Sequence, residues 1–160
     1  MKISISTVVK NDKENLKITM QSILSQKYQN FEYIIFDGMS FDGTSQYIRK
    51  NLKNRYVYIR KKDRNYYDGL NQAIKVAKGE YIGILNAGDK YYSNKTLKII
   101  HDKLNKKNYD LLFGNLIYFN QNLKYKRIWK LPFKKFNKVS ALKIASPTLF
   151  IKKKIYKKIK

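Results

Sequence analysis

Two short runs of this sequence set carboxylates beside glycines directly after apolar segments. In the first, FDGMSFDGT (residues 36–44), Asp37 ends an apolar segment and Gly38 follows it. A carboxylate there can accept hydrogen bonds from a base or a ribose. Gly38 and Gly43 permit backbone conformations, and close approach of a ligand, that other residues do not. Asp-Gly and Ser-x-Asp-Gly are also common turn sequences, so this run alone favours the two interpretations about equally.

The second run, LNAGD (residues 85–89), ends in Asp89. A carboxylate just past a buried strand can hold a hard divalent cation, Mn²⁺ or Mg²⁺, and such a cation can neutralise a diphosphate leaving group. Asn86 can supply an amide oxygen or orient a water, and Gly88 leaves room for a sugar diphosphate. An ordinary β-turn with a turn-favouring aspartate is the alternative.

A third group of polar residues opens a segment typical of a helix, within DRNYYDGLNQAI (residues 63–74). Asp63, Asp68 and Asn71 would lie where this helix passes near the two runs above. Acids in the first turn are also favoured by the helix dipole, so capping is the alternative interpretation of Asp68.

These residues need an alternation of strands and helices to bring them together. Apolar segments predict strands at residues 3–9, 31–36, 56–59, 80–85 and 110–119. Helices are predicted to begin at Asn11 or Asp12, at Thr44 or Ser45, at Tyr67 and at Ser93 or Asn94, with Gly79 as the C-terminal cap of the third. This order predicts an α/β fold with a mostly parallel, Rossmann-like sheet flanked by helices. Ligands bind such sheets beyond the carboxyl ends of the strands, where Asp37 and Asp89 are expected.

The charge of the chain invites a different interpretation. The net charge is +24, but only five of the 35 basic residues are Arg, which nucleic-acid binders favour. We therefore expect mostly solvated lysines with some attraction to an anionic membrane surface. Cysteine is absent from the sequence, which excludes disulfides. The single histidine, His101, falls on a predicted helix surface, and we interpret it as solvated and without a role.

Together the motifs resemble a known family. The order of TVVKN, SILSQ, YIIFDGMSFDGT, DRNYYDGLNQAI and AKGEYIGILNAGD is similar to glycosyltransferase family 2 with its GT-A fold, and to the bacterial surface-polysaccharide subgroup of colanic-acid-type transferases. The resemblance is strong over residues 1–119 and weak over 140–160. It implies a nucleotide-sugar-binding α/β domain at residues 1–119 and, at 120–160, the incomplete start of the acceptor side of the same domain.

The resemblance also implies roles for single residues. Nucleotide-sugar binding falls to residues that match the family's first loop, base-binding acid and helix motif, together with the asparagine of the LNAGD run: Thr7, Val9, Asn11, Asp37, Asp63, Asp68, Asn71 and Asn86. Asp42 matches a more structural acid of the Ser-x-Asp-Gly-Thr loop, and Asp89 matches the last acid of the metal-binding motif. The chain departs from the family at Asn86 and Gly88, which replace acids of many relatives, so metal binding is expected to rest mainly on Asp89.

The implied reaction is inverting transfer of a sugar from a nucleotide diphosphate donor, UDP by preference, to a glycan or lipid-linked acceptor. A strand is predicted at SPTLFI (residues 146–151), and KKKIYKKIK looks like the start of a helix after it. We expect the general base of this reaction to be absent, because no acid follows Asp110 and the chain looks truncated within this last helix. A cytoplasmic protein, peripheral on the inner face of the membrane, is expected from the basic end of the chain. The alternatives are a basic nucleic-acid-binding module and a nucleotidyltransferase, although the latter normally has a glycine-rich loop after the first strand.

Overall fold

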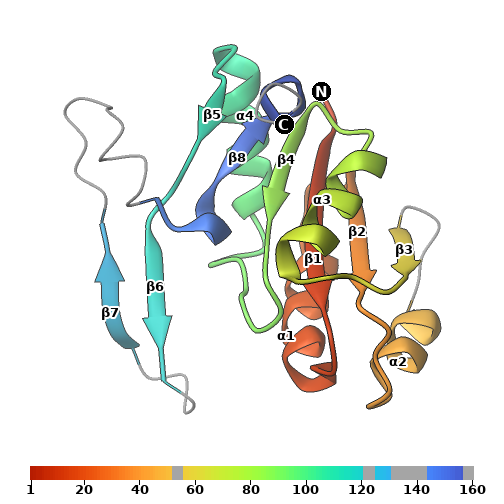
Figure 1. Cartoon of the computed structure of the whole chain (residues 1–160). Coiled ribbons are helices and arrows are strands. Elements are labelled where there is room, and N and C mark those ends of the chain that lie inside the picture. Colours follow the sequence, from red (N-terminus) through yellow and green to blue (C-terminus); the bar gives the residue numbers. More distant parts are fainter. Residues whose placement is uncertain (52–55, 121–124, 131–143, 157–160) are drawn as a thin grey trace.

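The computed structural model describes residues 1–51, 56–120, 125–130 and 144–156, built around a six-stranded sheet in the order β3-β2-β1-β4-β8-β5 (Figure 1). Four strands are parallel: β3 (Tyr56–Arg60), β2 (Phe31–Asp37), β1 (Ile3–Val9) and β4 (Tyr81–Ile84). Strand β8 (Phe150–Lys152) runs antiparallel to β4 and to the edge strand β5 (Leu111–Leu112). The predicted α/β fold with a mostly parallel sheet is confirmed.

Helices cover both faces of this sheet (Figure 1). α1 (Lys13–Leu24), α2 (Thr44–Asn51) and α4 (Thr96–Lys106) pack their apolar residues into one core cluster, and α3 (Tyr66–Val76) packs into a second cluster on the other face. Strands β1 and β2 are buried along their whole length because both faces are covered, and polar side chains within them pair with each other, as when the Ser4 hydroxyl donates to Glu32 at 2.6 Å. Among the described residues, no helix combines the length and apolar character needed to cross a bilayer.

The strand predicted for residues 110–119 is wrong as a single element. Its first part is β5, whereas Leu116–Phe119 form β6, which leaves the main sheet and pairs with β7 (Tyr125–Trp129) in a two-stranded sheet (Figure 1). The predicted strand at 146–151 is likewise shorter. Ser146–Thr148 form a 3₁₀ helix, η1, with proline in its first turn, and only β8 and the short helix α6 (Lys153–Tyr156) follow.

Gly79 is not the cap of α3, as the sequence had suggested. The helix ends at Val76 with Ala77 as its C-cap, and Gly79 instead lies against β1. A Cβ at Gly79 would lie 2.5 Å from the backbone nitrogen of Ser4, and the Gly79 N–H donates to Ser4 Oγ at 2.8 Å. The glycine is therefore explained by close backbone approach.

Helix starts also use partners that the sequence does not reveal. Asp12 precedes α1 as expected but makes no capping bond with its own side chain. Instead Asp42, from the loop before α2, accepts the Lys13 N–H at 3.1 Å and the Thr44 N–H at 3.0 Å. One carboxylate thus joins the starts of two helices, in line with the structural role expected for Asp42.

Candidate functional site

The carboxyl ends of the four parallel strands meet at one edge of the sheet, and the loops leaving them carry most predicted site residues. Val9 at the end of β1 lies opposite Asp37 at the end of β2, and Asp37 lies opposite Arg60 at the end of β3. The Asn86–Asp89 turn leaves β4, the other neighbour of β1. This is the edge at which α/β sheets bind ligands.

Asp37 is fully buried at this edge. Its Oδ1 accepts the Ser40 N–H at 2.8 Å, and its Oδ2 accepts the hydroxyls of Ser45 at 2.5 Å and Tyr58 at 2.8 Å. Arg60 Nε lies 3.7 Å from Oδ2. Burial alone raises the pKa of this carboxyl, but the hydrogen bonds outweigh it and hold the pKa below its ordinary value. Asp37 therefore fastens the loop after β2, and its contact with a base stays a prediction.

Asn11 joins the end of β1 to the same loop. Its N–H donates to Ser40 Oγ at 2.8 Å, and its side-chain Oδ1 accepts the Phe41 N–H at 2.9 Å. Asn11 has a φ of 50°, a left-handed conformation that asparagine tolerates better than most residues. The phenyl ring of Phe41 is left 86% exposed beside it.

Asp63, in the loop after β3, lies against the end of β2. A Cβ at Gly38 would lie 3.0 Å from Asp63 Oδ1 and 3.2 Å from Cδ of Lys10, so glycine is what lets these side chains approach. The Asp63 side chain is only 7% exposed, and Lys10 Nζ lies 4.0 Å from its Oδ1. The structure thus brings Asn11, Asp37 and Asp63 to adjoining strand ends.

The turn that carries Asp89 is anchored by α1. The Thr19 hydroxyl donates to the carbonyls of Asn86 at 3.0 Å and Asp89 at 2.8 Å. The Gly88 N–H donates to the Asn15 carbonyl at 3.1 Å, and the Asp89 N–H closes the turn on the Asn86 carbonyl at 3.0 Å. Gly88 has a φ of 91°, which favours glycine. The backbone of this turn is therefore held in place by its neighbours.

Asp89 itself is half-buried, and it forms no ion pair with a basic residue in the part of the chain that the structure describes. Burial raises the pKa of Asp89 above its ordinary value, although hydrogen bonds from Asn86 partly offset this. A carboxylate that is desolvated and lacks a basic partner suits a divalent cation. Within the described ranges, no group of three or more His, Cys, Asp or Glu side chains could hold a metal ion, so ligand phosphates and water would complete the coordination, as is common for Mg²⁺.

Two predicted binding residues support the edge from inside the core. Thr7 is completely buried, donates its hydroxyl to the Leu85 carbonyl at 2.6 Å and accepts the Tyr33 hydroxyl at 3.0 Å. Val9 is buried in the core cluster, and its carbonyl accepts the Gly38 N–H at 2.9 Å. The structure does not bring the side chain of either residue to the exposed edge.

Asp68 and Asn71 lie on α3. Asp68 Oδ2 accepts the Arg64 N–H at 3.1 Å, and the Asp68 N–H donates to Asn65 Oδ1 at 3.0 Å, so Asp68 takes part in the capping that its position suggested. The backbone hydrogen bond from Arg64 is the main reason that the pKa of Asp68 is lowered. Asn71 is exposed on the same helix.

Three residues of the site were missed by the sequence reasoning: Asn15, Thr19 and Tyr66. Tyr66 donates its hydroxyl to Asn86 Oδ1 at 2.5 Å and so connects the loop of Asp63 with the turn of Asp89. No pattern in the sequence marks any of the three, because Thr19 and Tyr66 are recognised only by the contacts their hydroxyls make with the Asp89 turn. His101 also differs from expectation: it is partly covered, with its ring centroid 4.6 Å from that of Tyr28.

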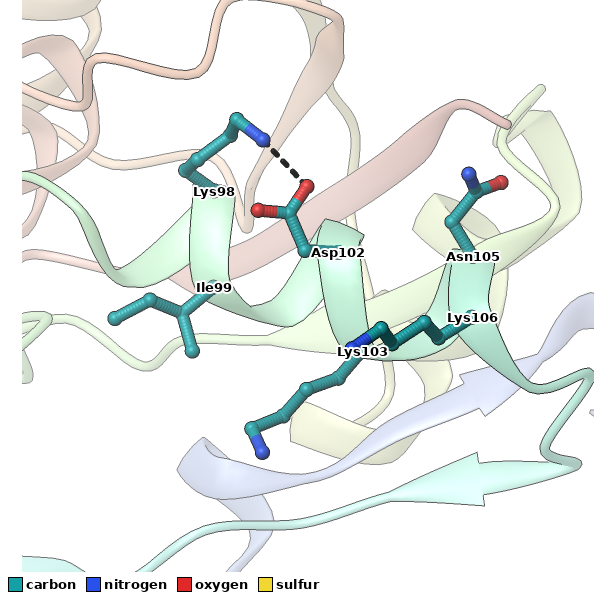
Figure 2. A pocket seen from close by; sticks show the side chains of 6 residues that line it. All are labelled: Lys98, Ile99, Asp102, Lys103, Asn105 and Lys106. Atoms are coloured by element: carbon teal, nitrogen blue, oxygen red, sulfur yellow. Dashed lines mark hydrogen bonds and ion pairs between the residues drawn. The ribbon is translucent and has the colours of Figure 1, made fainter.

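An open hollow of about 780 Å³ lies elsewhere, over the exposed face of α4 (Figure 2). Figure 2 shows the side chains around it, among them Ile99, Lys103 and Lys106. None of the predicted site residues lines this hollow. The strand-end edge is therefore the better candidate for the functional site.

The fold and this edge define a GT-A protein. The chain superposes on the crystal structure of S. aureus TarS in complex with UDP-GlcNAc with a TM-score of 0.82, at 20% identity over 99% of this chain and 47% of that one. It superposes on the mannosyltransferase PcManGT from Pyrobaculum calidifontis in complex with GDP-Man and Mn²⁺ with a TM-score of 0.75, at 16% identity over 98% and 46%. Residues 4–158 match Glycosyl transferase family 2, and the chain belongs to that family.

Relatives at the sequence level are also glycosyltransferases. The chain is 37% identical over 103 residues to the Escherichia coli enzyme WfaP, a UDP-Glc:alpha-D-GlcNAc-diphosphoundecaprenol beta-1,3-glucosyltransferase, covering 62% of this chain and 40% of WfaP. It is 29% identical over 174 residues to the glycosyltransferase MJ1057 of Methanocaldococcus jannaschii, covering 99% of this chain and 58% of MJ1057. The chain thus spans about half the length of these relatives. The alternatives of a nucleic-acid-binding module or a nucleotidyltransferase are not favoured.

Proposed function

We propose that the chain binds a nucleotide-sugar donor, UDP-linked by preference, at the strand-end edge, and that it serves inverting transfer of the sugar to a glycan or lipid-linked acceptor. The family match supports glycosyl transfer. The preference for UDP rests on the names of similar proteins, since WfaP is named for UDP-Glc and TarS was solved with UDP-GlcNAc. WfaP is also named for a diphosphoundecaprenol acceptor, which supports a lipid-linked acceptor here.

The observation that carries this proposal is the state of Asp89. Its half-buried carboxylate has no basic partner among the described residues, and Thr19 and Asn15 fix its turn from outside. When bound there, a divalent cation would neutralise charge on the donor diphosphate. Asp89 would hold that cation, while Asp37 and Asn11 would keep the loop after β2 in shape to receive the nucleoside.

A nucleotide panel tests the donor proposal. Calorimetric titration of the chain with UDP, GDP and CDP, each with and without Mn²⁺, should give the tightest binding for UDP with metal. Equal affinity for all three nucleotides would contradict the UDP preference. Absence of nucleotide binding by a folded chain would contradict the donor site itself.

We also propose that the exposed face of α4 contacts anionic lipid headgroups. The hollow in Figure 2 is lined by Lys103 and Lys106 beside Ile99, which is 51% exposed. Each lysine near an anionic surface contributes about 1 kcal/mol, and an exposed apolar side chain adds shallow insertion. Lys98 contributes less, because it pairs with Asp102 at 2.5 Å.

Vesicle sedimentation tests this contact. The double variant Lys103→Glu/Lys106→Glu should bind vesicles rich in phosphatidylserine at least about tenfold more weakly than the wild-type chain. The matched control Lys50→Glu/Lys75→Glu makes the same change of charge on α2 and α3 and should bind more tightly than the α4 variant. Equal losses in both variants would show that only overall charge matters and would contradict a specific surface on α4.

A further inference from the structure

Tyr66 is not among the proposed donor-binding residues, but its side chain contacts the turn that carries Asp89. It is the first residue of α3, and its hydroxyl lies 2.5 Å from Asn86 Oδ1, although the two residues are 20 positions apart. Asn86 in turn precedes Asp89 by three positions, within the turn that the Asp89 N–H closes on the Asn86 carbonyl. The phenol therefore contacts a side chain of the turn that carries the proposed metal ligand.

The turn links this contact to Asp89. The phenol donates to the Asn86 amide oxygen, because an amide oxygen can only accept. The Asn86 carbonyl accepts the Asp89 N–H at 3.0 Å, and the Thr19 hydroxyl donates to the carbonyls of both residues. Tyr66 therefore fixes the side chain of Asn86 at the start of the turn, while Thr19 fixes the backbone of the turn.

The start of α3 holds Tyr66 in the position that this chain of bonds requires. Asn65 caps the helix by accepting the Asp68 N–H at 3.0 Å, and Asp68 accepts the Arg64 N–H at 3.1 Å. The ring of Tyr66 also meets the ring of Tyr67 edge-on, at a centroid distance of 5.4 Å. The phenol is thus placed by contacts that are independent of the Asp89 turn.

We infer that Tyr66 is a positioning residue that, through Asn86, fixes the turn of Asp89 and so places the Asp89 carboxylate for the divalent cation of the donor complex. The inference rests on the proposed function, because it assumes that Asp89 holds a metal together with a nucleoside diphosphate. It also assigns Asn86 a role that differs from direct ligation, because its amide oxygen already accepts the hydrogen bond of the phenol. Loss of residues that hold metal ligands commonly costs ten- to a hundredfold in metal affinity.

The test compares two neighbouring tyrosines. Tyr66→Phe removes the hydroxyl that bonds to Asn86, and Tyr67→Phe removes the hydroxyl of the adjacent, 72% exposed ring. UDP affinity is measured by calorimetry with and without Mn²⁺, and the ratio of the two affinities isolates the contribution of the metal. Tyr66→Phe should reduce this ratio about tenfold while leaving metal-free UDP affinity unchanged, and Tyr67→Phe should leave both unchanged.

A double-mutant cycle completes the test. In an Asn86→Ala background the amide is gone, so Tyr66→Phe should cause no further loss of the metal-dependent ratio. A Tyr66→Phe protein with the wild-type ratio, or the same loss in both backgrounds, would overturn the role of Tyr66. If the wild-type chain binds UDP without any effect of Mn²⁺, that result would contradict the metal role in the proposed function and, as a consequence, this inference.

Discussion

Thr19 connects the fold to the candidate site, and its replacement by valine is a sharp test of how that site is held. The Thr19 side chain is fully buried on α1 and donates one hydroxyl to the carbonyls of Asn86 and Asp89. Valine keeps the shape but removes the donor. The Asn86 carbonyl retains the Asp89 N–H as a partner, whereas no other bond to the Asp89 carbonyl is seen among the described residues. The loss is therefore close to one buried unsatisfied carbonyl.

An unsatisfied buried acceptor costs about 1–3 kcal/mol. For a chain of this size, a loss of about 2 kcal/mol lowers Tm by about 4–8 °C. Thermal unfolding followed by circular dichroism measures this shift, and calorimetry with UDP and Mn²⁺ measures the site. Thr19→Val should lower both stability and metal-dependent UDP affinity. Thr19→Ser loses only a buried methyl group and keeps the hydroxyl, so it should retain donor affinity close to that of the wild-type chain. A Thr19→Val protein with wild-type Tm and affinity would refute the reasoning.

Two further predictions concern the scaffold. Gly79→Ala should destabilise the chain by about 3 kcal/mol in urea unfolding, because the new Cβ would lie 2.5 Å from the Ser4 backbone nitrogen. The control Gly114→Ala should change stability by less than about 0.5 kcal/mol, because no heavy atom lies within 4 Å of a Cβ at that position. Asp37 has a lowered pKa in the folded chain, so its stabilising effect is present above the ordinary pKa of 3.8 and is lost as the pH falls below it. Asp37→Asn should therefore flatten the acid limb of a stability–pH curve below about pH 4, and an unchanged acid limb would contradict this assignment.

The parts of the fold that follow from local pattern were predictable. Segments 3–9 and 31–36 are dense in β-branched and aromatic residues, and both became strands buried on two faces. The division of the segment at 110–119 was missed, although Gly114-Asn115 is a pair common in turns. What divides it is that β5 pairs with β8, which is distant in sequence, whereas β6 pairs with β7, the next strand along the chain. Gly79 was misread for a similar reason, since the residue it approaches, Ser4, is 75 positions away.

In the candidate site, too, some features follow from the sequence pattern and others depend on tertiary contacts. The placement of Asp37 and Asp89 at strand ends follows from the alternation of elements and was predictable. The saturation of Asp37 by Ser45 and Tyr58, and the support of the Asp89 turn by Thr19, depend on tertiary contacts that periodicity does not contain. The sequence thus indicates where carboxylates gather, and the structure distinguishes the one that is internally satisfied from the one that is not.

Asp89 gives the most direct test of the account. UDP affinity should be measured by calorimetry with and without Mn²⁺ for the wild-type chain, for Asp89→Asn, and for Asp102→Asn as a control on the exposed face of α4. The account predicts that Mn²⁺ tightens UDP binding to the wild-type and Asp102→Asn chains, and that Asp89→Asn abolishes this effect while remaining folded. Metal-dependent UDP binding that persists unchanged in Asp89→Asn would contradict it.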